Sequence, residues 1–387
     1  MASFLDPIKN IFSVKHKGAT LGVDIGSSSI KIVLLEKIEE KAVLRNYGEI
    51  VLGPRAGVAA GQATNLSPEK IAEAIHDLLL EMGVTARHTL LAIPFSASLL
   101  SVIELPDVGQ KELKSMVPLE ARRYIPVPVS EVSLDWWVLP KRKKKKVAVV
   151  SMSPLVPVAP AISEDDDEKP VGNVDVIIAA IHNETLKKYE TIERDAHLPG
   201  EMSHFEIEIF SMLRAVVGRD LATALVIDIG AGSTKLALVD EGLVRGSHIV
   251  SLGGQDITLA LARSQNISFA QAEEIKCRVG MMGDEEGRDV AAAADLILGN
   301  IMSEAVRFAE NHERKYEMKV AKVVLVGGGA RLSGVEKITA KKFPHASVTA
   351  GNPFTRVDTP AFLDATLKEI GPNFVVALGI ALKGLEE

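Results

Sequence analysis

Two stretches of similar sequence decide the fold of this chain: GVDIGSSSIKIVLLEK at residues 22–37 and VIDIGAGSTKLALVDE at residues 226–241. Each contains Asp-Ile-Gly at the same place and has a lysine seven positions after the aspartate. In each copy a buried strand ends at Asp-Ile-Gly, small hydroxylated residues form a tight turn, and a second apolar strand follows. The spacing between the two copies is far too long for a solenoid repeat. The pair therefore predicts two similar lobes, each led by a β-hairpin.

The segments after the two hairpins also correspond. In each half we expect three strands followed by a helix, and the first of these helices begins at Ser67-Pro68, which is typical of a helix N-terminus. The strands are expected at 20–25, 30–36 and 41–51 in the first half, and at 224–229, 234–240, 243–250 and 323–326 in the second. The helices are expected at 67–82, 253–263, 268–278, 289–315, 335–342 and 372–382.

Residues 85–197, between the two halves, predict an inserted α+β subdomain. Its strands are expected at 89–93, 98–105, 133–139 and 175–181, and its helices at 109–124 and 183–196. Within it, residues 141–170 carry a basic run, a proline-rich stretch and an acidic run, which predicts a mobile surface loop. The basic run would contact anionic lipid or an acidic partner, but a solvated loop whose opposite charges pair loosely is the favoured interpretation.

These elements predict a domain division. The first-lobe core would comprise residues 1–84, completed by 198–220 and by a C-terminal helix at 372–387. The inserted subdomain would span 85–197. The second-lobe core would comprise 221–265 and 317–371, with a helical subdomain at 266–316.

Composition limits the fold and the classes of function. The 387 residues are 47% hydrophobic but only 4% aromatic, which favours about two or three domains with aliphatic sheets covered by helices. The net charge of −7 argues against nucleic-acid binding. The single cysteine, Cys277, cannot form an internal disulfide, and we expect a packed or bystander thiol in a reducing compartment. The first 18 residues lack the features of a signal peptide, and we expect no segment to cross a membrane.

The hairpin turns carry the chemistry. Their backbone N–H groups and hydroxyls are suited to phosphate oxygens, and the aspartate at the strand end is suited to Mg²⁺, directly or through water. Two such hairpins facing each other would clamp a polyphosphate from both sides. The glycines of VGGGARLSGV at 326–335 would let the backbone approach a flat ligand, although in isolation they would indicate a tight turn. Glu273 and Lys276 share one helical face and would bind ribose hydroxyls or, alternatively, form a simple ion pair.

DIGSSSIK, DIGAGSTK and VGGGARLSGV together resemble the two phosphate motifs and the adenosine motif of the actin-like ATPase superfamily, which includes actin, Hsp70, sugar kinases and FtsA. Within it, the chain is similar to the PilM family of type IV pilus assembly. This resemblance is carried by LGVDIGSSSIKIVLLE, the inserted subdomain, SLGGQDIT, AEEIK and VVALGIALKGL, and it covers nearly the whole chain from residue 21. It implies an α/β, actin-like ATPase fold: two lobes of mixed sheet with helices, and an FtsA/PilM-type α+β insertion in the first lobe.

The resemblance implies that ATP with Mg²⁺ binds between the lobes, and it assigns residues by position. The first phosphate site would be lined by Asp24, Gly26, Ser27, Ser28, Ser29 and Lys31. The second would be lined by Asp228, Gly230, Gly232, Ser233, Thr234 and Lys235, with Gly253 and Gly254 at the next helix start. Glu273 and Lys276 would hold the ribose, and Gly327, Gly328, Gly329 and Arg331 would flank the adenine. Asp24 and Asp228 would hold Mg²⁺ through water.

Hydrolysis of ATP would need a positioned water and a group to orient it. The candidates are Asp24, Asp228, and Glu206 or Glu208 in HFEIEIFSMLRA at 204–215. That segment is equally well interpreted as an element boundary with exposed carboxylates. Because no catalytic base stands out, we expect slow or absent ATPase activity.

The resemblance further implies a cytoplasmic scaffold, held at the inner membrane of a bacterium through protein partners. A groove beside the inserted subdomain, near the helix around 116–124, would receive the short N-terminal peptide of a PilN-like inner-membrane protein. Other expected partners are a motor ATPase or platform protein, and a homo-oligomer or ring remains open. The alternatives are an FtsA-like cell-division protein, disfavoured because 378–387 lacks a basic amphipathic helix, and a sugar-kinase-type phosphotransferase, disfavoured because no sugar-binding cluster stands out.

Overall fold

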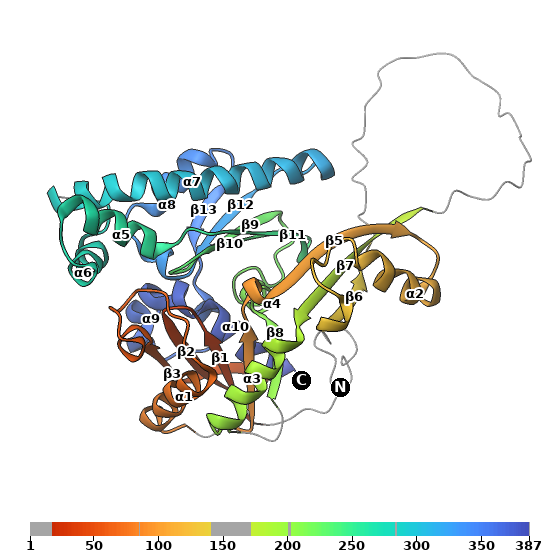
Figure 1. Cartoon of the computed structure of the whole chain (residues 1–387), viewed down its shortest axis with the longest axis horizontal. Helices are drawn as coiled ribbons and strands as arrows, with labels where there is room; N and C mark the ends of the chain where they lie inside the picture. The colour runs from red at the N-terminus through yellow and green to blue at the C-terminus, as the bar shows by residue number, and fades with distance from the viewer. Residues whose placement is uncertain (1–17, 85, 141–171, 200–202, 283–284, 387) are drawn as a thin grey trace, which may run out of the picture.

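The computed structural model describes residues 18–386, apart from 85, 141–171, 200–202 and 283–284 (Figure 1). Residues 1–17 and the loop predicted at 141–170 lie outside the described residues. The described part forms two five-stranded sheets and one three-stranded sheet.

The first lobe is a five-stranded sheet in the order β3-β2-β1-β4-β8. β1 (Ala19–Ile25), β2 (Ser29–Ile38) and β3 (Lys41–Val51) are antiparallel, whereas β4 (His88–Ile93) and β8 (Ser203–Ile207) join in parallel. Leu21 and Val23 point to one face of β1, toward α1 (Pro68–Met82). The opposite face is covered by α10 (Val375–Glu386), which packs on Gly22 so closely that a Cβ there would collide with the helix backbone.

The second lobe repeats this arrangement in the order β11-β10-β9-β12-β13. β9 (Ala224–Ile229), β10 (Thr234–Asp240) and β11 (Leu243–Val250) are antiparallel, and β12 (Lys322–Val326) and β13 (Ser347–Ala350) add in parallel. The helices of this lobe are α5 (Gly254–Gln265), α6 (Phe269–Val279), α7 (Glu285–Tyr316) and α8 (Val335–Lys342). Figure 1 shows the long α7 lying along this sheet, and the two lobes confirm the α/β fold.

The inserted sheet has the order β5-β7-β6 and is entirely antiparallel. It consists of β5 (Ser98–Pro106), β7 (Asn173–His182) and β6 (Val132–Val138). α2 (Gln110–Ala121) contains Pro118 and packs on this sheet through Leu113 and Val117. The N-terminal part of β5 reaches the second lobe, where Ser247 Oγ lies 3.4 Å from Leu100 O.

The structure corrects the predicted domain boundaries at three places. β4 was expected in the insertion, but it pairs in parallel with β1 and therefore belongs to the first-lobe sheet. α3 (Asn183–Asp195) likewise packs mainly against α1, with fewer contacts to β7 of the inserted sheet. Residues 353–370, expected in the second lobe, contribute Phe354 and Leu367 to the core beneath β2 and β3. These errors concern contacts between segments that are far apart in sequence. The remaining domain boundaries stay a proposal.

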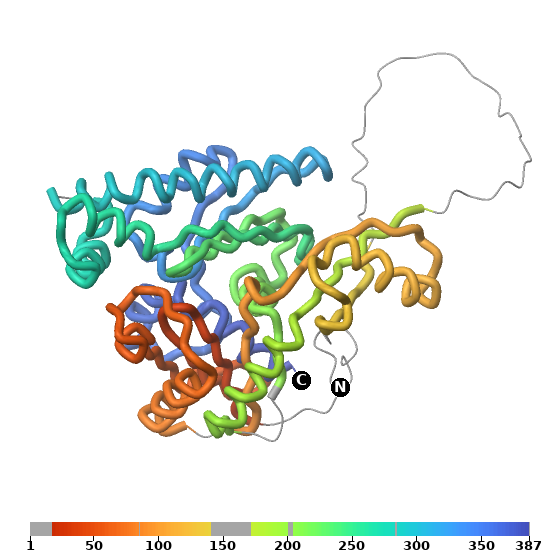
Figure 2. The backbone as a smooth tube through the Cα atoms, in the orientation of Figure 1, coloured from red at the N-terminus to blue at the C-terminus, as the bar shows by residue number. Residues whose placement is uncertain are grey.

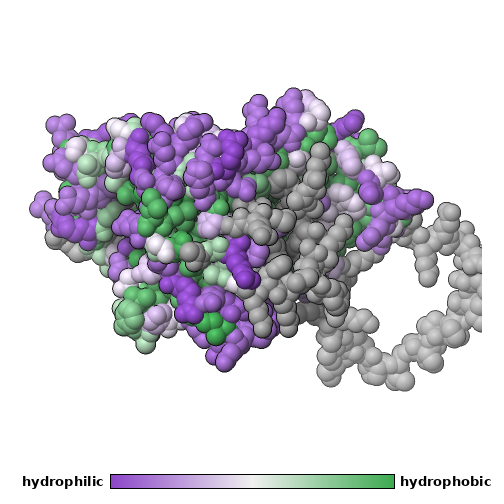
Figure 3. Space-filling model, turned by 90° about the horizontal axis from the view of Figure 1, so that it is seen from below, coloured by the Kyte–Doolittle hydropathy of each residue, from purple (hydrophilic) through white to green (hydrophobic). Residues whose placement is uncertain are grey.

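The C-terminal region is apolar because it is part of the core. By length and composition, Ala361–Glu386 is the one stretch among the described residues that would suffice to cross a membrane, but 61% of its most apolar window is buried inside the protein. Figure 2 shows this segment, in blue, beside the red first strands. On the face in Figure 3, hydrophilic residues cover most of the described surface and hydrophobic residues form smaller patches.

Candidate functional site

The turns of the two Asp-Ile-Gly hairpins have the same backbone structure. Gly26 N donates to Ser29 O at 3.0 Å, and Gly230 N donates to Ser233 O at 3.0 Å. A Cβ on these glycines would lie 2.9 and 3.0 Å from the same carbonyl oxygens, closer than real Cβ atoms normally come. The repeated glycine is therefore required by the turn in both lobes.

The spacing of seven residues places each aspartate opposite its lysine. Asp24 pairs with Lys31 across β1 and β2, and Asp228 pairs with Lys235 across β9 and β10. Residues directly opposite in an antiparallel pair point to the same face of the sheet. All four side chains line one pocket.

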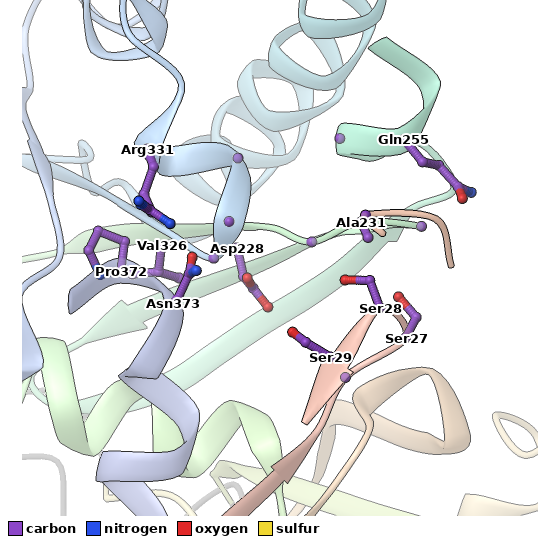
Figure 4. A pocket seen from close by; sticks show the side chains of 18 of the residues that line it. Ser27, Ser28, Ser29, Asp228, Ala231, Gln255, Val326, Arg331, Pro372 and Asn373 are labelled. Carbon is purple, nitrogen blue, oxygen red and sulfur yellow. The ribbon is translucent and has the colours of Figure 1, made fainter. Parts of the chain in front are cut away.

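This pocket has a volume of about 700 Å³ and lies between the lobes, within the size range of small-molecule sites. Figure 4 shows Ser27, Ser28 and Ser29 on one side of it, Asp228 near the middle, and Arg331 and Asn373 toward the other end. Most predicted site residues line it: Asp24, Gly26, Ser27, Ser28, Ser29, Lys31, Asp228, Gly230, Gly232, Ser233, Lys235, Gly254, Glu273, Lys276, Gly327, Gly328, Gly329 and Arg331. Their roles in binding a ligand stay predictions.

Two predicted site residues support the second hairpin instead of lining the pocket. Thr234 is fully buried, and its Oγ1 donates to Leu252 O at 2.8 Å. Gly253 packs against the backbone of Ala231, and its N–H donates to the Asp256 carboxylate at 2.8 Å. Through these contacts both residues hold the start of α5 against the hairpin turn.

Glu206, a predicted catalytic candidate, does not line this pocket. It is 4% exposed, and its two oxygens accept hydrogen bonds from the Arg214 guanidinium, both at 2.8 Å. Ser211 Oγ also donates to it at 2.5 Å, and Lys383 lies 3.8 Å away. Burial by itself raises the pKa of Glu206, but Arg214 and the other partners bring the pKa below its ordinary value. Glu206 therefore joins α4 (Glu208–Val216) and α10 to the first-lobe sheet.

Glu208 is the carboxylate of this segment that lines the pocket. It is only 6% exposed. The alternative interpretation is therefore right about an element boundary, since β8 ends at Ile207 and α4 begins at Glu208, but wrong about exposed carboxylates. Phe95 N donates to Glu208 Oε1 at 2.6 Å, and Lys235 Nζ donates to Glu208 Oε2 at 2.9 Å. An ion pair thus crosses from the first lobe to the second inside the pocket.

Lys235 has a second partner in its own lobe, since its Nζ donates to Asp228 Oδ2 at 3.1 Å. Burial alone would lower the pKa of Lys235, but Asp228 and Glu208 raise it above its ordinary value. Lys235 is therefore held as a cation between two carboxylates.

Asp24 has a different environment. Burial raises the pKa of its carboxyl to about 6, with Lys31 opposing this shift and Glu208 adding to it. Lys31 Nζ donates to Ser29 Oγ at 2.8 Å and lies 3.6 Å from the Glu49 carboxylate.

The helical side of the pocket is a small polar network. Lys276 Nζ donates to Glu273 Oε2 at 2.7 Å, to Thr258 Oγ1 at 2.8 Å and to Gly254 O at 3.1 Å. Both the ligand role and the simple ion pair were open from the sequence. The structure contains the ion pair, and it also places both residues at the pocket.

The loop between β3 and α1 reaches the second lobe at this point. Gly61 has a φ of +82°, and a Cβ there would lie 2.6 Å from Glu273 Cδ. Ala63 N donates to Gln255 Oε1 at 3.0 Å. These contacts hold one end of the pocket closed.

The glycine-rich turn forms the other end. Gly327 has a φ of +79°, its N–H donates to Pro372 O at 2.8 Å, and a Cβ would collide with Asp228 Oδ1. Arg331 Nη2 donates to Glu369 Oε1 at 3.0 Å. Asn373 Oδ1 is buried without a hydrogen-bond partner within the described part of the chain.

Several lining residues were missed or undervalued by sequence reasoning. Gln255 lies within the motif SLGGQDIT and Asn373 lies just before the motif VVALGIALKGL, so a signal was present. Gly61 comes from a loop without a motif, and only the folded chain brings it to Glu273. Cys277, expected as a packed or bystander thiol, is exposed at the pocket, with Sγ 3.4 Å from Glu273 Oε1.

Comparison with known proteins agrees with this architecture. Residues 22–152 match the family described as type IV pilus assembly protein PilM, and residues 225–379 match the family described as cell division protein FtsA. A solved structure of a PilM–PilN type IV pilus biogenesis complex contains a chain that superposes with a TM-score of 0.74 at 27% identity. That superposition covers 97% of this chain and 100% of the other.

More distant relatives share parts of the sequence. The ethanolamine utilization protein EutJ of Escherichia coli K12 is 29% identical over 33% of this chain and 41% of its own length. FtsA of Agrobacterium fabrum is 24% identical over 54% of this chain and 51% of its own length. The chain thus spans about half or less of the curated relatives it matches. These findings confirm the actin-like ATPase fold and the resemblance to the PilM family.

Proposed function

We propose that this chain, which shares its fold and its diagnostic motifs with the PilM-type actin-like ATPases, is an ATP-binding scaffold of type IV pilus assembly. The observation that carries the proposal is the superposition, over nearly the whole length of both chains, on a PilM–PilN complex. The fold match includes the inserted sheet, which is where a partner-specific role would reside.

The pocket supports ATP with Mg²⁺ as the ligand. The two serine-containing turns would hold the phosphates, and the polar network of Glu273 and Lys276 would face the ribose. The fit is clearest at Gly327, where the absence of a Cβ lets the backbone lie directly against Asp228. Asp24 and Asp228 offer the carboxylate oxygens that Mg²⁺ prefers, directly or through water. Bound Mg²⁺ would neutralise phosphate charge there.

We propose that ATP hydrolysis is slow or absent. A group that orients an attacking water needs a free acceptor oxygen. Glu208 is the best-placed carboxylate outside the hairpins, and both of its oxygens already accept hydrogen bonds, one from Phe95 N and one from Lys235. These bonds hold the carboxylate toward Phe95 and Lys235, so an attacking water would have to use the remaining lone pairs of the same two oxygens.

The proposed partner is the cytoplasmic N-terminal peptide of a PilN-like inner-membrane protein. Its groove would lie beside the inserted sheet, near α2, where Leu119 is 61% exposed and Tyr124 is 43% exposed. Through this peptide the chain would be held at the cytoplasmic face of the inner membrane. Links to a motor ATPase or platform protein, and assembly into a ring, belong to the same proposal.

Titration of the PilN-like peptide into the purified protein, with and without ATP, tests this role. We expect saturable binding, weakened by Leu119→Asp. The matched control is Leu221→Asp, because Leu221 is 69% exposed on the second lobe. No binding in either nucleotide condition, or equal loss in both variants, would contradict the scaffold role.

An FtsA-like role is the second candidate, and the match of residues 225–379 to the FtsA family favours it. Sedimentation of the purified chain with anionic phospholipid vesicles, without any partner peptide, separates the two. Direct sedimentation with the vesicles would favour the FtsA-like role, whereas peptide-dependent sedimentation supports the scaffold.

A further inference from the structure

Glu208 and Lys235 form a buried ion pair between the two lobes in the pocket, whereas the pair of Arg331 and Glu369 at the other end is exposed. Glu208 is the first residue of α4 in the first lobe, and Lys235 lies on β10 in the second. Their side chains are 8% and 18% exposed, and the two charged groups are 2.9 Å apart. A pair this close and this buried is screened little by salt.

The Glu208 carboxylate is fixed independently of the lysine. Its Oε1 accepts the backbone N–H of Phe95 at 2.6 Å, and Phe95 is itself buried at the end of β4. A hydrogen bond to an ionised carboxylate is stronger than one between neutral groups. Glu208 would therefore stay in place if Lys235 moved to another partner.

The charge balance around the pair opposes a polyphosphate. Three carboxylates, those of Asp24, Asp228 and Glu208, line the pocket centre together with two ammonium groups, those of Lys31 and Lys235. Glu49 adds a further carboxylate 3.6 Å from Lys31. A phosphate that approaches Lys235 must share its ammonium group with Asp228 and Glu208, which already accept two of the three N–H donors.

We propose that Glu208 is a positioning residue that acts through Lys235: it draws the ammonium group toward α4, competes with the ligand phosphate for it, and so lowers the affinity for ATP. This inference rests on the proposed function. It assigns Glu208 an effect opposite in sign to that of a ligand-binding residue, because removing its charge strengthens binding of the ligand.

Glu208→Gln tests the proposal, since glutamine keeps the shape and retains an oxygen acceptor for Phe95 N. We expect the Kd for ATP to fall about tenfold, which corresponds to about 1.4 kcal/mol. Adenosine carries no phosphate, so its Kd should not change. Glu49→Gln is the matched control, because it removes the carboxylate partner of the other lysine, Lys31. The gain in ATP affinity should be smaller for Glu49→Gln than for Glu208→Gln.

The double variant Glu208→Gln/Lys235→Gln separates action through Lys235 from general repulsion. We expect the gain from Glu208→Gln to disappear when Lys235→Gln is already present. A gain of the same size in that background, an equal gain for adenosine, or unchanged ATP affinity in folded Glu208→Gln would overturn the proposal.

A second variant and the unchanged protein complete the experiment. If Glu208→Gln does not fold, Glu208→Asp shortens the side chain and weakens its hold on Lys235, and it should also strengthen ATP binding. Absence of ATP binding by the unchanged protein would instead contradict the proposed function itself.

Discussion

The hairpins of the two lobes have the same turn and the same Asp–Lys register, but their lysines have different partners. Lys31 stays within its own lobe, with Ser29 and Glu49 as partners. Lys235 binds Asp228 in its own hairpin and Glu208 across the pocket. The same motif therefore has two roles. The lysine of the first hairpin binds partners within its own lobe, and the lysine of the second hairpin connects the two lobes.

Loss of the two lysines should separate these purposes most strongly. Lys235→Gln leaves Asp228 and Glu208 buried without their cation, and we expect a loss of about 3–5 kcal/mol in the free energy of unfolding. Lys31→Gln should cost about 1 kcal/mol or less, because its partner Glu49 is more exposed. Urea denaturation measures both. Equal losses in the two variants would show that the cross-lobe ion pair contributes nothing special.

The aspartates should differ in ligand binding. Asp228→Ala removes a carboxylate proposed to hold Mg²⁺ at the phosphates, and we expect the Kd for ATP with Mg²⁺ to rise about a hundredfold while the fold survives. Isothermal titration with ATP and Mg²⁺ checks the affinity, and circular dichroism checks the fold. Unchanged affinity would mean that the second hairpin does not bind phosphate.

The aspartates should also differ in their effect on stability with pH. The folded-state pKa of Asp24 is raised to about 6, so the folded protein binds more protons than the unfolded chain between roughly pH 4 and 6. The contribution of Asp24 to stability is therefore present at low pH and is lost as the pH rises through about 6. Asp24→Asn should be more stable than the unchanged protein at pH 7.5, by about 1–3 kcal/mol.

At pH 4 this advantage of Asp24→Asn should disappear. Asp228→Asn is the matched substitution in the other hairpin, and it should destabilise the protein at pH 7.5 because Lys235 loses a partner. Urea denaturation at the two pH values gives all four comparisons. A stability difference for Asp24→Asn that does not vary with pH would contradict the buried, proton-binding role of Asp24.

The smallest effect is expected where the first lobe touches the second through its loop. Gln255→Ala removes the acceptor for Ala63 N and should cost about 1 kcal/mol of stability. The Kd for ATP should rise by less than about tenfold, because the substitution removes one side-chain contact and keeps the backbone hydrogen bond from Gln255 N to Ala231 O in the second turn. A larger effect on ATP binding than that of Asp228→Ala would make the loop, and not the second hairpin, the main cross-lobe contact.

Local patterns in the sequence were sufficient for the hairpins and the fold. The seven-residue spacing of Asp and Lys determines their pairing, since a two-residue turn leaves one register. Non-local contacts were not predictable in the same way. The pattern HFEIEIF offers two carboxylates, and only the packing of Arg214 against Glu206 decides that Glu208 faces the pocket. The parallel pairing of β4 with β1 likewise depends on segments far apart in sequence.

The fit of α10 against Gly22 and Ser211 has a consequence for the order of folding. The second-lobe sheet uses strands within residues 224–350 and is complete before the last helix leaves the ribosome. The first-lobe sheet contains β1, β2 and β3, which precede the second lobe in sequence, yet one face is covered by segments that follow the second-lobe strands, including Phe354, Leu367 and α10 (Figure 2). This apolar face therefore stays uncovered until those later segments have been synthesised, and until then it is open to non-native contacts.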